Sequence, residues 1–214
     1  NVLDIAGIAS DFEAPSGGEI VTDDNGNPTG VFLNRAQTLI TEAMPPATLE
    51  QKKRIVLSGL MEIAEAGYVS GHHAGVYADY YPAYAALAEE ENLPVRVEAM
   101  LAARPENLDL MNSWIERGPT RDPAQKFQVR GVKAYYDASL GSRGAKMIED
   151  YSDMPGHRGV SGSEYGFPED VVMAAIAAGF QVGVHAIGDA GNREVLDFYE
   201  RAAAEDTNSL ALLH

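Results

Sequence analysis

Hydrophobic and polar positions change their spacing along this chain. From residue 48 onward, short apolar runs alternate with longer stretches in which apolar residues recur at intervals of three and four. The short runs are typical of buried strands, and the longer stretches are typical of helices with one buried face. Before residue 48 two short β-favouring segments flank a run of turn residues. The chain is therefore expected to have two parts, 1–47 and 48–214.

The first part is predicted to hold a β-hairpin. Residues 19–22 and 29–33 favour strands, and Asn25-Gly26 between them is a strong tight-turn signal. Pro45-Pro46 closes the segment. We expect 1–47 to be a hairpin-containing entry or insertion segment that precedes the main domain.

The second part is predicted to alternate strands and helices. Thr48 followed by Gln51 forms a capping-box pattern that opens a helix to about Ala66. The strands expected after it are 67–71, 94–101, the one around Lys133, 180–186 and 209–214. The expected helices are 79–90, 106–117, a weak one at 145–150, 168–178 and 189–205. Strands separated by helices at this spacing form parallel sheets, so the fold class is α/β.

About five parallel strands are predicted, which is too few to close an eight-stranded barrel. Two architectures remain open, namely an open doubly wound sheet and a partial (β/α)8 TIM barrel. The last predicted strand stops at the C-terminal His214, and the chain starts at Asn1 rather than at Met. We therefore expect a chain that is cut at both ends, in which an N-terminal targeting segment would not be visible.

Composition excludes several functions. Hydrophobic residues make up 45% and charged residues 22%, which is ordinary for a globular domain. The formal net charge of −16 argues against nucleic acid or an anionic membrane as partner, because both would be repelled. No apolar run approaches the length of a membrane span, and there is no cysteine for a disulfide or a thiolate metal site. A cytoplasmic location is favoured, and exposed sheet edges would allow a homo-oligomer.

Three unusual residues fall at the C-terminal ends of successive predicted strands, namely Lys133, His185 and His214. Active sites in α/β folds are built at that end of the sheet. Two imidazoles and an oxygen donor suit a divalent cation such as zinc. A lysine ammonium would repel that cation, so metal binding requires Lys133 to be neutral or chemically converted. Taken alone, each of the three is more often structural, and Lys133 has Asp137 as an available ion-pair partner.

Other polar residues lie close to these strand ends in the sequence. Asp137 and Arg143 follow the Lys133 strand and are predicted to orient a substrate, with a local ion pair as the alternative. His72-His73 follow another predicted strand. Because adjacent residues point in opposite directions, one of the two is expected to line the pocket, and His73 is assigned to it. The nucleotide-binding and hydrolase motifs with fixed spacing, such as Walker A and Gly-x-Ser-x-Gly, are absent.

Several blocks of residues occur together in one order. They are Asn1–Gly7, Gly17–Val21, Gly26–Val31, Val132-Lys133 with Asp137–Arg143, Tyr151–Asp153, and His185–Ala190 with Asn192-Arg193 and Val195–Asp197. As a set they resemble the YtcJ-like amidohydrolases (amidohydrolase family 3), which include N-substituted formamide deformylase and AepA-like proteins. The resemblance covers almost the whole chain. It implies a metal-dependent hydrolase on a (β/α)8 barrel that acts on a small molecule with an amide-type C–N bond through a metal-activated water.

The resemblance also implies roles for individual residues. In that superfamily a carboxylated lysine lies on the fourth strand and histidines lie on the fifth and sixth, which match Lys133, His185 and His214. Carboxylation would turn the lysine from a cation into a bridging carboxylate that holds one or two divalent ions, with zinc preferred.

Two parts of the family pattern are missing from this chain. It contains neither the His-x-His pair of the first strand nor the aspartate of the eighth, and His72-His73 lies in a segment that looks like the second strand. The chain is therefore expected to be the central fragment of a longer enzyme and to have little or no activity alone. The alternative is a non-catalytic binding or regulatory protein that uses the same scaffold.

Overall fold

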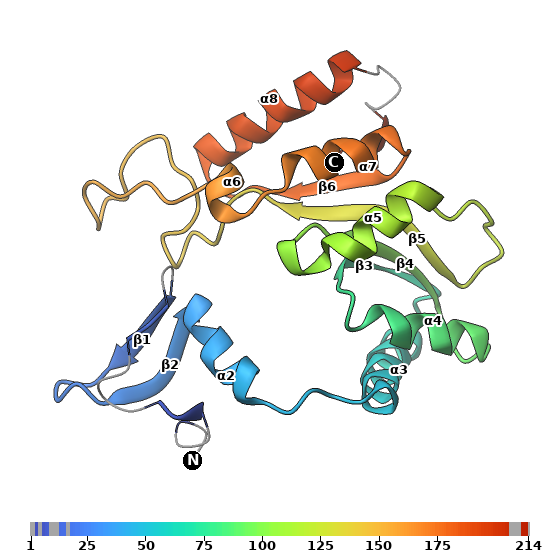
Figure 1. Cartoon of the computed structure of the whole chain (residues 1–214), viewed down its shortest axis with the longest axis horizontal. Coiled ribbons are helices and arrows are strands. Elements are labelled where there is room, and N and C mark those ends of the chain that lie inside the picture. Colours follow the sequence, from blue (N-terminus) through green and yellow to red (C-terminus); the bar gives the residue numbers. More distant parts are fainter. Residues whose placement is uncertain (1–2, 4–5, 9–12, 16–17, 206–210, 214) are drawn as a thin grey trace. The chain divides into compact units, whose positions relative to one another are not determined.

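The structure of this chain is a computed structural model that describes residues 3, 6–8, 13–15, 18–205 and 211–213 (Figure 1). The chain divides into two compact units, Asn1–Ala47 and Thr48–His214. Each unit has its own secondary structure and is described by itself below.

The first unit contains the predicted β-hairpin. Strand β1 (Gly18–Thr22) pairs antiparallel with β2 (Pro28–Asn34), and η1 (Arg35–Gln37) and α2 (Thr38–Ala43) follow. The carboxylate of Asp23 accepts hydrogen bonds from the backbone N–H groups of Asn25 and Asn27, at 2.9 and 2.8 Å. Gly26 adopts a φ of +80°, which a glycine reaches without a Cβ clash. The turn residues therefore fix the hairpin, as the sequence predicted.

The second unit begins with helix α3 (Leu49–Glu65), whose first turn is held by the predicted capping box. The backbone N–H of Gln51 donates to the Thr48 hydroxyl at 3.3 Å, and the N–H of Thr48 donates to the Gln51 side chain at 2.8 Å. These two bonds satisfy two N–H groups that the helix cannot pair internally.

A four-stranded parallel sheet forms the centre of this unit. Its strands are β3 (Ser70–Val76), β4 (Arg96–Ala102), β5 (Phe127–Tyr135) and β6 (Gln181–His185), and they are neighbours in that same order. The intervening helices are α4 (Tyr81–Glu89), η2 (Pro105–Asn107), α5 (Leu108–Arg117), α6 (Gly162–Tyr165) and α7 (Glu169–Ala177), and α8 (Asp189–Glu205) follows β6. None of the helices in the described part of the chain is long and apolar enough to cross a bilayer.

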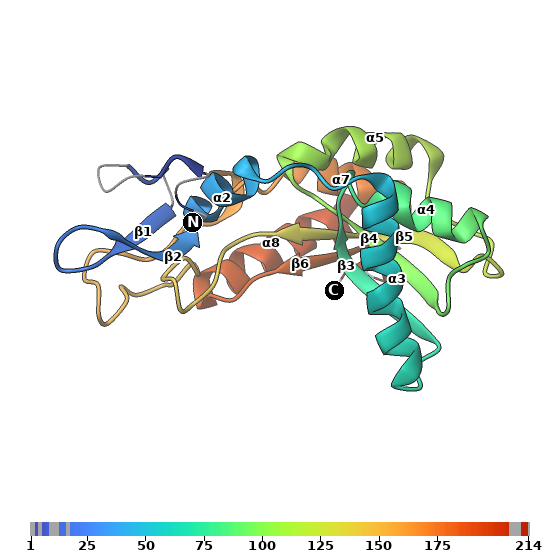
Figure 2. The same ribbon diagram turned by 90° about the horizontal axis from the view of Figure 1, so that it is seen from below.

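The two faces of the sheet differ in burial. Alternate strand residues, among them Val97, Val132 and Val182, are fully buried in one core with residues of the helices. Figure 2 shows α4, α5 and α7 on one side of the strands. Because side chains alternate along a strand, Lys133 and Tyr135 on β5 belong to the opposite face, where they are partly exposed.

The strand order decides between the two architectures that the sequence left open. A doubly wound sheet reverses its order at a switch point, whereas a (β/α)8 barrel adds its strands in chain order. The four strands here follow chain order. The fold is thus α/β with a parallel sheet, as predicted, and corresponds to part of such a barrel; the described strands do not close into a ring.

The predicted fifth strand, 209–214, falls largely outside the described residues. Of its part that the structure describes, Leu213 forms a parallel bridge with Val182 of β6. The polypeptide therefore returns to the sheet beside β6.

Two predicted elements differ from the structure. Residues 145–150 form an irregular loop with bends instead of a weak helix, because the backbone N–H groups of Lys146 and Ile148 donate to the carboxylates of Asp137 and Asp189 rather than to preceding carbonyls. The strand expected at 67–71 runs from Ser70 to Val76 in the structure. The sequence did not indicate these bounds, because the residues of this strand do not alternate between polar and apolar types. His72 and His73 consequently lie inside β3 and do not follow it.

Replacing Phe180 tests the core. Its side chain is 0% exposed just before β6, so Phe180→Ala is expected to cost about 3–5 kcal/mol of unfolding free energy by removing apolar contacts and leaving a cavity. Urea unfolding followed by circular dichroism measures this loss. The matched control is Leu196→Ala, whose side chain is 65% exposed, and its cost should stay within about 0.5 kcal/mol. Equal losses in the two variants would contradict the assigned core.

Candidate functional site

Lys133 and His185 lie on adjacent strands at one face of the sheet. In the parallel register Lys133 pairs with Gly183, and Tyr135 pairs with His185, so the side chains of Lys133 and His185 leave the sheet on the same side. The Lys133 ammonium lies 5.0 Å from the centre of the Tyr135 ring. The centre of the His185 ring lies 5.9 Å from the centre of the same tyrosine ring. The structure therefore brings these two predicted ligands to a shared neighbour at the C-terminal ends of β5 and β6.

His214, the third predicted ligand, lies outside the described residues. Its neighbour Leu213 bridges β6 through Val182. Over the described ranges of the chain, no group of three or more His, Cys, Asp or Glu side chains is placed to hold a metal ion. The assignment of Lys133, His185 and His214 as metal ligands stays a prediction.

The surroundings of Lys133 disfavour its charged form. Burial lowers the pKa of its ammonium below the ordinary value, and the nearby Arg104 guanidinium lowers it further. The direction matters because only a neutral amine attacks an electrophile such as CO2. The Lys133 backbone is held as well, since its carbonyl accepts a hydrogen bond from the N–H of Ala103 at 2.8 Å.

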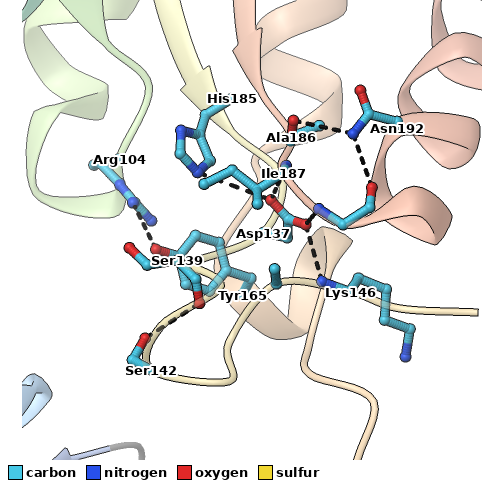
Figure 3. A network of polar contacts seen from close by, with 12 residues as sticks. Arg104, Asp137, Ser139, Ser142, Lys146, Tyr165, His185, Ala186, Ile187 and Asn192 are labelled. Carbon is cyan, nitrogen blue, oxygen red and sulfur yellow. Dashed lines mark hydrogen bonds and ion pairs between the residues drawn. The ribbon is translucent and has the colours of Figure 1, made fainter. Parts of the chain in front are cut away.

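Asp137 is a buried carboxylate just beyond the C-terminal end of β5 (Figure 3). It is 0% exposed, and its Oδ1 accepts the backbone N–H of Ile187 at 2.9 Å. Its Oδ2 accepts the N–H groups of Gly188 at 2.8 Å and Lys146 at 2.9 Å. We call this set of three hydrogen bonds the Asp137 clamp. A buried carboxylate needs such donors, because an unpaired charge in the interior is costly.

The Asp137 clamp joins the loop after β5 to the loop after β6. Because two of its donors, Ile187 and Gly188, lie in the loop just after His185, the clamp holds the end of the strand from which the imidazole projects. His185 Nε2 lies 3.9 Å from Asp137 Oδ1. Two glycines make room for it. A Cβ at Gly191 would lie 2.6 Å from Asp137 Oδ2, and one at Gly188 would collide with the backbone of Lys146. Glycine is therefore required by the packing at positions 188 and 191.

Asp189 adds a second connection between the same loops. Its carboxylate accepts the N–H of Ile148 at 2.8 Å, from the segment that follows Lys146, and also that of Ala190 at 2.8 Å. Asn192 reaches back along α8 and donates to the carbonyl oxygens of Ala186 and Gly188. The loop between β6 and α8 is thus held by side chains at both ends.

Asp137 and Arg143 were predicted to orient a substrate, with an ion pair as the alternative. The structure does not pair them with each other. Arg143 forms an exposed ion pair with Asp153, its Nη2 lying 2.8 Å from Oδ2, while the Asp137 carboxylate is occupied by the clamp. Direct substrate contact by either residue stays a prediction, and the geometry gives both a structural task.

His73 is not brought to Lys133 and His185. It pairs in register with Ala99 of the core face, and its Nδ1 lies 2.9 Å from the Tyr84 hydroxyl of α4. The reason is that β3 starts later than expected, so His73 lies within the strand and its side chain follows the alternation of side-chain directions. Its neighbour His72 belongs to the opposite face, where its Nε2 lies 3.8 Å from a Glu98 carboxylate oxygen.

Three residues of this region were not singled out from the sequence, namely Arg104, Tyr135 and Tyr165. Arg104 follows β4 by two residues, and its guanidinium carbon lies 4.2 Å from the Tyr135 ring centre and 4.9 Å from that of Tyr165. The rule that found Lys133, a charged residue at the C-terminal end of a strand, would also have found Arg104. No local sequence signal indicated that Tyr165 contacts Arg104, because the two residues are 61 positions apart in sequence.

Comparison with known proteins gives a consistent family match. Residues 1–210 match the family model described as "Amidohydrolase family". The chain is 28% identical over 217 residues to the putative amidohydrolase YtcJ of Bacillus subtilis, covering 99% of this chain and 40% of that protein. It is 27% identical over 221 residues to the protein LONG AFTER FAR-RED 3 of Arabidopsis thaliana, covering 94% and 36%. The chain spans about two fifths of the length of these curated relatives.

Solved structures with the same fold include two crystal structures of uncharacterized metal-dependent hydrolases. The one from Pyrococcus horikoshii superposes with a TM-score of 0.71 at 21% identity, over 94% of this chain and 39% of that chain. The one from Pyrococcus furiosus gives 0.70 at 23% identity, over 94% and 40%. At these identities the similarity confirms the fold.

Replacing Asp137 tests the clamp. In Asp137→Asn the amide group has one acceptor oxygen, so at least one of the three backbone N–H groups loses its partner in a buried place. The expected cost is about 1–3 kcal/mol of unfolding free energy, together with faster amide hydrogen exchange at Lys146, Ile187 and Gly188. Urea unfolding measures the loss of free energy, and hydrogen-exchange NMR measures the exchange rates of the three amides.

The matched control is Asp153→Asn at the exposed Arg143 ion pair, which should leave both measurements near their original values. If Asp137→Asn unfolds and exchanges like the control, the clamp does not hold these loops.

Proposed function

Since this chain belongs to the amidohydrolase family, we propose that the complete gene product is a metal-dependent hydrolase that cleaves amide-type C–N bonds in small molecules. The observation that supports this most directly is the position of Lys133 and His185 on the same face of two adjacent parallel strands, near the C-terminal ends, with each side chain close to the Tyr135 ring. In α/β barrels this end of the sheet is where catalytic groups gather.

In this proposal Lys133 acts as an oxygen ligand after carboxylation. Its neutral amine attacks CO2, forming a new N–C bond, and one proton passes to water, which leaves a carbamate with one negative charge. The lowered pKa of Lys133 supports the first step, because it increases the neutral fraction of the amine. The modification would also remove the repulsion that an ammonium exerts on a cation.

The donor set of the site then fits a divalent ion such as zinc. A carbamate oxygen from Lys133 and an imidazole nitrogen from His185 are ligand types that zinc accepts, and His214 is the proposed further imidazole. The Asp137 clamp would keep the His185 ring in place, as residues behind metal ligands commonly do. A bound ion would activate a water molecule and polarise the substrate carbonyl.

Metal content tests this assignment. The complete gene product is expected to contain one or two divalent ions per chain and to hydrolyse members of a panel of small amides, N-substituted formamides included. Lys133→Ala should lose metal and activity together, because it removes the bridging oxygens, while its circular dichroism spectrum stays that of the folded protein. Inductively coupled plasma mass spectrometry measures the metal.

The matched control is Lys126→Ala, located just before the opposite end of β5, where its ammonium donates to the Leu93 carbonyl. It should keep both metal and activity. A Lys133→Ala variant that retains both would refute the assignment of Lys133. A complete gene product that takes up no metal after incubation with zinc would favour the non-catalytic scaffold instead.

A further inference from the structure

Arg104 presents a positive charge held in place by two aromatic rings. Its guanidinium carbon lies over the rings of Tyr135 of β5 and Tyr165 of α6, at 4.2 and 4.9 Å from the ring centres, and its Nη2 lies 3.4 Å from the Tyr165 hydroxyl. Figure 3 shows the side chain reaching toward Tyr165. Stacking of this kind restricts a flexible side chain and leaves the edge of the guanidinium available for hydrogen bonding.

The charge on Arg104 has no carboxylate partner within the ranges that the structure describes. Two other arginines of the chain do pair with acids: Arg143 with Asp153 and Arg201 with Glu169. The chain has 32 acidic against 16 basic residues, so carboxylates are abundant. A guanidinium has five N–H donors in a planar fork that matches a carboxylate, and the contact with Tyr165 takes at most one of them.

The position of Arg104 relates it to the proposed reaction site. Tyr135 is the shared neighbour, because Arg104, Lys133 and His185 all lie within 6 Å of its ring centre, at 4.2, 5.0 and 5.9 Å. Backbone contacts tie the same strands together, since Ala102 pairs in register with Lys133. A substrate carbonyl held at Lys133 and His185 would therefore place the adjacent part of the molecule near Arg104.

We propose that Arg104 binds a carboxylate of the substrate, so that the preferred substrates are amides with a carboxylate next to the bond that is cleaved. N-acyl amino acids have this chemistry, because a single carbon atom separates their carboxylate from the amide nitrogen. The inference rests on the proposed hydrolase function for its substrate class, but the carboxylate-binding site itself does not. Arg104 would determine specificity, and the chemical step would remain with the residues at Lys133.

Kinetics on matched substrates test the specificity. In the complete gene product, Arg104→Gln should lower kcat/KM for N-formyl and N-acetyl amino acids about 10- to 100-fold, mainly by raising KM, because a charged hydrogen-bonded pair is lost. For the corresponding N-acyl amino acid amides, in which a carboxamide replaces the carboxylate, the change in kcat/KM should stay within about twofold. Arg104→Lys should restore part of the loss, since it keeps the charge without the planar fork.

The matched control is Arg117→Gln on α5, because Arg117 also stacks on an aromatic ring, that of Trp114, at 4.7 Å. It should leave both substrate classes unaffected. Equal losses on charged and neutral substrates, or loss of bound metal in Arg104→Gln, would overturn the inference, because Arg104 would then act on Lys133 or on folding. Circular dichroism checks that each variant is folded.

Binding without turnover separates this inference from the proposed function. NMR of the arginine side-chain N–H groups should show a shift for Arg104 when N-acetylalanine is added, and none when N-acetylalaninamide is added. If N-acetylalanine binds at Arg104 but no amide is hydrolysed, the carboxylate-binding role of Arg104 is supported and the proposed hydrolase function is refuted. If amides are hydrolysed while Arg104→Gln changes neither binding nor the preference for charged substrates, the hydrolase function stands and the inference about Arg104 fails.

Discussion

The buried carboxylate of Asp137 is the interaction on which the candidate site depends. A carboxylate that is 0% exposed is stable only if its charge is compensated, and here three backbone N–H groups supply the compensation. Those donors come from two loops, and Lys146 in the first is 41 residues before Ile187 in the second. Satisfying one charge therefore fixes both the segment after the Lys133 strand and the end of the strand that presents His185. Catalytic groups need this kind of support, because small displacements of reacting groups reduce rates strongly.

The second constraint is the alternation of side chains along the strands. Val132 and Val182 enter the core with the helices, and this orientation directs Lys133 and His185 to the other face. A shift of the register by one residue would exchange the two sets, so the hydrophobic core also specifies which side chains can react. Arg104 joins the same neighbourhood through Tyr135, which contacts all three functional candidates.

Much of the fold could be predicted from the sequence because it depends on local signals. The Asn25-Gly26 turn, the Thr48 capping box and the alternation of strands with helices all appeared where they were expected. The position of Lys133 and His185 on one face of adjacent strands followed from a general rule about parallel strands. The Asp137 clamp could not be predicted, because its partners are backbone groups whose direction no residue type encodes. The place of His73 was missed for a similar reason, since a polar strand without alternation gives no boundary.

The central claim is that Lys133 and His185 hold a divalent ion together. The most direct measurement is a crystal structure of the complete gene product grown with zinc, with the ion located by its anomalous scattering. The account predicts a carboxylated Lys133 with an oxygen about 2.0–2.2 Å from the ion and a His185 ring nitrogen about 2.0–2.1 Å from it. An ion bound elsewhere, or an unmodified Lys133 beside an empty position, would contradict it.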